Sequence, residues 1–158
     1  MPTLEERIQV LEDRESIREV IANYCRGVDQ HDEALFLSIW TEDAGYLIGE
    51  PLGDHHGLAA IKDILHAIWE AFPETHHFTT NAVIEVDGDT ARSVSDVDCT
   101  ATDGAGRAML IAATYFDDLV RQDDEWRIKQ RKLTIYYMTP ILEPWSLDPA
   151  TKLNLATA

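Results

Sequence analysis

The chain has 158 residues, 45% of them hydrophobic, and its 29 acidic and 13 basic side chains give a net charge of −16. This length and composition predict a single globular domain that can bury a sizeable core. The acidic excess argues against nucleic acid or an anionic membrane surface as a partner, because both need a clustered basic face.

Helices are predicted in the first half of the chain. Thr3 and Glu6 have the spacing of a capping box, and the apolar residues that follow recur at helical spacing as far as Val28. Gly27 lies near the expected end of this helix, where glycine is common, and Pro73 is expected to stop the third helix. The helices are expected over 3–28, 33–40 and 57–71, with a short strand at 43–49.

After residue 75 the hydrophobic pattern changes to that of long strands joined by tight turns. The turns contain the sequences DGD, DGAG and QDDE. Helices followed by a strand meander predict an α+β fold with helices on one face of a curved sheet. Four strands are expected, over 76–86, 90–102, 107–121 and 125–138. The domain is expected to cover 1–140, with a proline-containing tail, 141–158, packed on the domain or on a neighbouring subunit.

The strand predicted at 107–121 is largely apolar on both faces. One face is expected to meet the helices or a pocket, and the other a partner subunit. We therefore expect a homo-oligomer, a dimer or a trimer, formed through the sheet.

The sequence gives no sign of secretion or of membrane insertion. The N-terminal segment is charged, without the apolar core of a signal peptide, and no apolar run approaches the length of a membrane span. Cys25 and Cys99 lack CxxC spacing, so two reduced thiols are expected. Together these features favour a cytoplasmic protein.

Two segments carry residues suited to acid–base chemistry. Asp29 follows the first helix, and His77 lies in the first long strand. A carboxylate and an imidazole that meet in an apolar cavity form a general base. The alternatives are a capping aspartate and a partly exposed sheet histidine. His76 and His77 are adjacent on a strand, so only one of them can face the interior, and the alternation does not decide which.

Several motifs resemble the SnoaL-like branch of the nuclear-transport-factor-2-like superfamily, over about residues 8–140. The motifs are YCRGVD at 24–29, ALFLSIW at 34–40, EDA at 42–44, THHFTTN at 75–81, and Arg131 with YYMTP at 136–140. The resemblance implies a cone-shaped barrel, in which three N-terminal helices cover a strongly bent, mainly antiparallel sheet around an apolar pocket.

The resemblance also implies site residues. The hexachlorocyclohexane dehydrochlorinases of this superfamily use an Asp–His dyad supported by a Lys and an Arg. Asp29, His77 and Arg131 match three of those positions, and Tyr24 stands at the Lys position. The set Tyr24, Asp29, His77 and Arg131 is similar to that of bile-acid 7α-dehydratase, and more distantly to that of scytalone dehydratase. Arg131 is expected to pair with Asp29 or to meet substrate.

These observations predict a cofactor-independent lyase that acts on an apolar, cyclic small molecule by dehydration or a related β-elimination. Neither a zinc-ligand spacing nor a phosphate-binding glycine loop is present, so no metal and no cofactor are expected. The same dyad could serve an isomerase or a polyketide cyclase, because each reaction begins with proton removal from carbon. A non-catalytic ligand-binding or assembly subunit is the remaining alternative.

Overall fold

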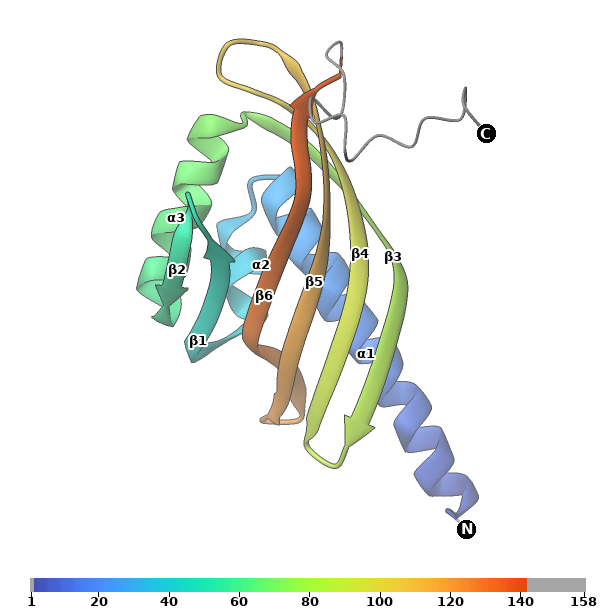
Figure 1. Cartoon of the computed structure of the whole chain (residues 1–158). Helices are drawn as coiled ribbons and strands as arrows, with labels where there is room; N and C mark the ends of the chain where they lie inside the picture. Colours follow the sequence, from blue (N-terminus) through green and yellow to red (C-terminus); the bar gives the residue numbers. More distant parts are fainter. Residues whose placement is uncertain (1, 142–158) are drawn as a thin grey trace, which may run out of the picture.

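The computed structural model describes residues 2–141, which form three helices packed on one face of a six-stranded sheet (Figure 1). This arrangement confirms the predicted α+β class. Within the described part of the chain, no helix is long and apolar enough to cross a membrane. The predicted tail lies outside the described residues, apart from Ile141.

Helix α1 (Leu4–Asp29) begins with the predicted capping box, in which Thr3 and Glu6 satisfy each other's backbone N–H groups. The helix matches the predicted range 3–28 to within one residue at each end, and Gly27 lies in its last turn. A Cβ atom on residue 27 would lie 2.7 Å from the Cβ atom of Phe36. The glycine therefore permits close packing of α2 (Glu33–Ser38), which begins at the N-cap Asp32.

Two paired strands and the third helix follow α2. Strand β1 (Trp40–Gly49) pairs with β2 (Gly53–His56), a short strand that the sequence pattern did not predict. Helix α3 (Gly57–Ala71) follows directly and buries Ile61, Ile64 and Leu65. Its bounds match the prediction because Pro73 stands just beyond it.

The long strands form the predicted meander. They are β3 (Glu74–Asp87), β4 (Thr90–Thr102), β5 (Ala108–Gln122) and β6 (Glu125–Pro140), each antiparallel to the next. Strand β1 adds to β6 in parallel, which gives the strand order β2-β1-β6-β5-β4-β3. Strand β6 runs two residues beyond its predicted end at 138 and ends at Pro140, where the domain was expected to end.

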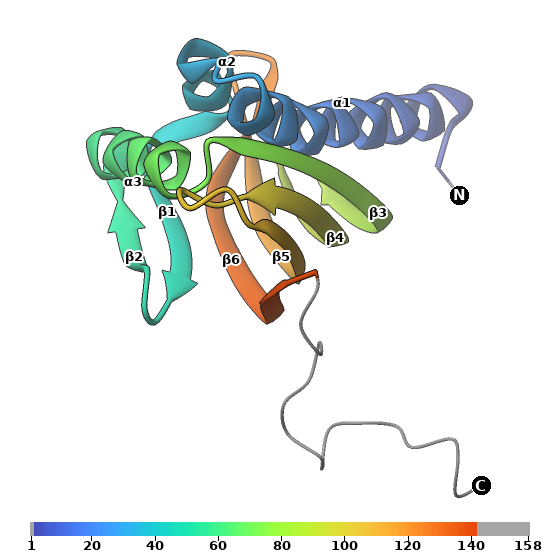
Figure 2. The same ribbon diagram turned by 90° about the horizontal axis from the view of Figure 1, so that it is seen from above.

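The sheet curves around the helices, and its concave face holds the core (Figure 2). Helix α1 packs on the concave face along β3, and α3 covers the end nearer β1 and β2. The C-terminal end of α1 thus lies beside the start of β3. This brings Asp29 and His77 to the same place, although they are far apart in the sequence.

Candidate active site

Asp29 and His77 are in direct contact. His77 Nδ1 lies 2.6 Å from Asp29 Oδ1, and the His77 backbone N–H donates to Oδ2 at 2.9 Å. Because an ionised carboxylate can only accept, Nδ1 carries the proton and Nε2 is the basic position. His76 lies on the opposite, exposed side of the strand. The contact expected between Asp29 and His77 is present.

A third residue, Thr75, holds the carboxylate. Its hydroxyl donates to Asp29 Oδ1 at 2.7 Å, from the same face of β3 as His77. Burial by itself would raise the pKa of the Asp29 carboxyl, but the hydrogen bonds from His77 and Thr75 outweigh it and lower the pKa. Asp29 is therefore ionised at neutral pH. Sequence reasoning missed Thr75, although its i, i+2 spacing from His77 places both on one strand face.

Two buried phenols lie beside the dyad. The hydroxyl oxygens of Tyr24, on α1, and Tyr46, on β1, are 2.5 Å apart. The ring of Tyr24 meets that of His77 edge-on, with centroids 6.2 Å apart. Burial raises the pKa of Tyr24 well above its ordinary value, and the neighbouring phenols add to this effect. Both hydroxyls are therefore protonated at neutral pH and able to donate. Tyr46 was not among the predicted site residues.

The expected pairing of Arg131 with Asp29 is wrong. The Arg131 guanidinium forms a bidentate ion pair with Asp117 on β5, with both N···O distances 2.7 Å. Both side chains have no exposed surface. Burial disfavours the charged guanidinium, but Asp117 outweighs this effect and raises the pKa of Arg131. The two residues are directly opposite each other in the β5–β6 ladder, which explains the pairing.

The buried guanidinium also contacts two of the site's aromatic rings. Its central carbon lies 4.3 Å from the ring centroid of Tyr24 and 4.1 Å from that of Tyr115. A cation over an aromatic face is attracted by the negative π surface. Arg131 thus supports the Tyr24 ring from behind, and does not line the cavity that His77 faces.

His77 opens into an apolar cavity of about 80 Å³ between the helices and the sheet. Among the described residues, the lining contains no Asp, Glu, Lys or Arg. The polar groups at its surface come from Tyr24, Tyr46, Thr75, His77, Cys99 and Tyr115; the rest of the wall is aliphatic or aromatic. A larger and more open groove, of about 760 Å³, contains neither residue of the dyad.

The other polar or acidic side chains considered are less suited to acid–base chemistry. Burial raises the pKa of Cys25 to about 11 and that of Cys99 to about 12, so both thiols stay protonated. Asp96 and Asp98, two carboxylates on the same side of β4, face outward. Within the described residues, no group of three His, Cys, Asp or Glu side chains is placed to hold a metal ion.

Comparison with known proteins shows which sequences and folds this chain resembles. The chain is 31% identical over 134 residues to hexachlorocyclohexane dehydrochlorinase 1 of Sphingobium indicum, covering 83% of this chain and 86% of that protein. A crystal structure of a type 2 hexachlorocyclohexane dehydrochlorinase superposes with a TM-score of 0.81 at 28% identity, covering 90% and 98% of the two chains. A structure from Novosphingobium aromaticivorans named as a candidate scytalone dehydratase shares the fold at 22% identity, with a TM-score of 0.76 and coverage of 91% and 97%.

Residues 9–132 match the family of SnoaL-like domains. That range runs from the first turns of α1 into β6, and it includes Tyr24, Asp29, His77 and Arg131. The chain therefore belongs to the family of SnoaL-like domains.

Proposed function

We propose that this protein is a cofactor-independent lyase that eliminates water from an uncharged, apolar cyclic substrate. The observation that carries the proposal is the contact between His77 Nδ1 and an ionised Asp29, beside an apolar cavity. The carboxylate fixes the imidazole tautomer and stabilises the imidazolium that forms when Nε2 takes a proton. The curated relatives that are hexachlorocyclohexane dehydrochlorinases support an elimination reaction.

The substrate class follows from the lining of the cavity. A charged substrate would lose its hydration without gaining an opposite charge, because the described lining offers no Lys, Arg, Asp or Glu. An uncharged molecule has no such cost. Its acidic C–H bond is expected next to a carbonyl or another electron-withdrawing group, since an imidazole is a weak base for carbon acids.

Every proton that moves in the proposed elimination can be assigned a donor and an acceptor. His77 Nε2 takes the proton from carbon, the C–H electron pair forms the new C=C bond, and the adjacent C–O bond breaks. The leaving oxygen takes a proton from Tyr24 or Tyr46 and departs as water. The proton on His77 then returns to the phenolate, so no oxidant, reductant or cofactor is consumed.

The pair of phenols favours loss of water over loss of halide. Hydroxide is a poor leaving group and needs a proton in the transition state, whereas chloride departs as the anion. Tyr24 and Tyr46, 2.5 Å apart and both protonated, are a proton source of the kind that water loss requires. Elimination of hydrogen chloride is the second candidate, and the relatives' activity is the observation that favours it.

The test measures products by mass. Purified protein is incubated with cyclic β-hydroxy ketones and with matched β-chloro ketones, and loss of water or release of chloride is recorded. We expect loss of water, and its rate should fall in Tyr24→Phe or in Tyr46→Phe, whichever removes the proton donor, by about 10²–10⁴, the range that one acid–base group contributes. Chloride release should be much less sensitive to that substitution.

His77→Ala and Asp29→Asn provide the controls for the dyad. Undiminished turnover in either variant would overturn the mechanism. Products of unchanged mass would instead indicate an isomerase or a cyclase, and faster chloride release than water loss would select the second candidate. Binding without turnover of any class would indicate a non-catalytic ligand-binding subunit.

A further inference from the structure

Helix α1 has two apolar stripes on opposite sides. One stripe packs on the sheet and consists of Ile17, Val20, Ile21, Tyr24 and Val28. The other consists of Leu4, Ile8 and Leu11, which are 69%, 45% and 63% exposed. At about 100° of rotation per residue, Ile8 lies nearly half a turn around the helix from Ile17. We call Leu4, Ile8 and Leu11 the outer stripe.

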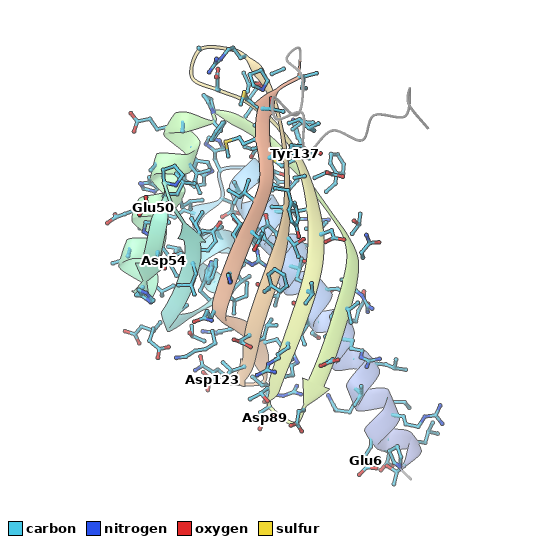
Figure 3. All side chains as sticks on the ribbon, viewed as in Figure 1. Glu6, Glu50, Asp54, Asp89, Asp123 and Tyr137 are labelled. Carbon is cyan, nitrogen blue, oxygen red and sulfur yellow. The ribbon has the colours of Figure 1, made fainter. Side chains whose placement is uncertain are left out.

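The outer stripe has nothing to pack against within the described chain. The N-terminal turns of α1 run past the edge of the sheet (Figures 1 and 2), and the side chain of Glu6 marks this projecting end (Figure 3). The first residue of α1 that is buried is Asp13, which is held by Arg121 and Trp126. Three large apolar side chains on a projecting helix mark an interaction surface.

Charged residues flank the outer stripe in two rows of opposite sign. Arg7 and Arg14 lie seven residues apart on one side, and Glu5 and Glu12 lie seven residues apart on the other. In the heptad notation of coiled coils, Leu4 and Leu11 occupy d, Ile8 occupies a, the arginines occupy g and the glutamates occupy e. A β-branched residue at a with leucine at d favours two strands.

We infer that the outer stripe pairs with the same stripe of a second copy of this chain, with the two α1 helices parallel and in register. In that arrangement Arg7 of each copy faces Glu12 of the other, so the flanking charges attract. An antiparallel pair would place arginine against arginine and glutamate against glutamate. The sequence pattern thus specifies both the partner and its orientation.

The shape of the molecule is compatible with this pairing. Because the outer stripe lies opposite the stripe that packs on the sheet, the two domains would stand on opposite sides of the helix pair without collision. The next a position is Glu15, which is exposed and would meet its own copy. Like charges there end the apolar contact at Leu11, so the interface is short and separate from the cavity at the other end of α1.

Light scattering on the full chain tests the inference. Ile8→Glu and Leu11→Glu should each halve the assembly mass at high micromolar concentration, with an unchanged melting temperature because both sites are exposed. The matched control is Ser16→Glu, which adds the same charge at an exposed position of α1 away from the outer stripe. A wild-type monomer, or unchanged mass in both outer-stripe variants, would overturn the inference.

Charge reversal and cross-linking test the orientation. Glu19, seven residues after Glu12, occupies the next e position and would face Arg14 of the other copy. Arg7→Glu with Arg14→Glu should weaken the assembly, and mixing with a chain that carries Glu12→Lys and Glu19→Lys should restore a heterodimer. Under oxidation, Leu4→Cys should form a disulfide with its own copy. If Leu4→Cys cross-links only to a Leu11→Cys chain, the helices are antiparallel and the inferred pairing is wrong.

Discussion

The hydroxyl of Thr75 should be worth a measurable amount of stability, because it donates to an ionised and largely buried carboxylate. The bond to Asp29 Oδ1 is 2.7 Å long, and the Asp29 side chain is only 17% exposed. A hydrogen bond to a charged group contributes about 1.5–3 kcal/mol. Thr75→Val keeps the shape of the side chain and removes the donor, so we expect a loss of about 2 kcal/mol in the free energy of unfolding at pH 7.

The loss should depend on pH in a defined direction. The pKa of Asp29 is lower in the folded protein than its ordinary value. The stability that its charge contributes is therefore present above the unfolded pKa, near 3.9, and is lost as pH falls through the folded pKa. Thr75→Val removes a bond to the charged form, so it raises the folded pKa. Once Asp29 is protonated, the difference between variant and wild type should shrink to about 1 kcal/mol or less.

Denaturant unfolding of wild type, Thr75→Val and Thr75→Ser measures this effect between pH 7 and the lowest pH at which the fold survives. Thr75→Ser restores the hydroxyl and should recover most of the lost stability at pH 7. The reasoning is refuted if Thr75→Val is as stable as wild type at pH 7. It is also refuted if the loss is the same across the whole pH range, since that would place the effect in packing.

The remaining predictions concern turnover and assembly. His77→Ala or Asp29→Asn should abolish turnover on the true substrate and leave cooperative unfolding, and near-wild-type rates in either variant would rule out the dyad. Activity should survive exhaustive chelation, and loss with chelator that zinc restores would contradict this. The outer sheet face exposes Phe78 and Phe116 at 64% and 41%, so Phe116→Glu should reduce the mass of an oligomer formed through the sheet. A monomer mass at micromolar concentration would exclude that oligomer.

Local patterns were enough to predict most of the fold. The capping box at Thr3 and the stop at Pro73 mark helix ends that the structure reproduces. Long strands with DGD and QDDE turns predicted the meander. Strand β2 was not predicted because a strand of four residues, Gly53–His56, is too short to show the alternation of apolar and polar side chains. The close contact of Gly27 with Phe36 was not predicted, because only the tertiary packing reveals it.

The candidate site, too, was predicted only in part from the sequence. The family motifs brought Asp29 and His77 together correctly, and their roles in catalysis stay predictions. The partner of Arg131 depends on strand register, which a sequence does not display. An irregularity in the β5–β6 ladder between Asp118 and Leu119 shifts the pairing by one residue, so simple counting from the turn does not place Asp117 opposite Arg131. Asp117 was therefore not predicted as the partner of Arg131. Tyr46 was not predicted as a site residue either, and it lies on β1, away in sequence from the motifs that carry the dyad.

Two of the interior charge pairs, Arg131–Asp117 and His77–Asp29, differ in a way that bears on function. Arg131 and Asp117 have no exposed surface, and their bidentate contact leaves Asp117 no open side. His77 and Asp29 keep 12% and 17% of their side-chain surface exposed, and His77 faces the cavity. A proton can reach only the second pair without disrupting the core. The sealed pair is therefore suited to hold the rings of Tyr24 and Tyr115, and the open pair to exchange protons with a bound molecule.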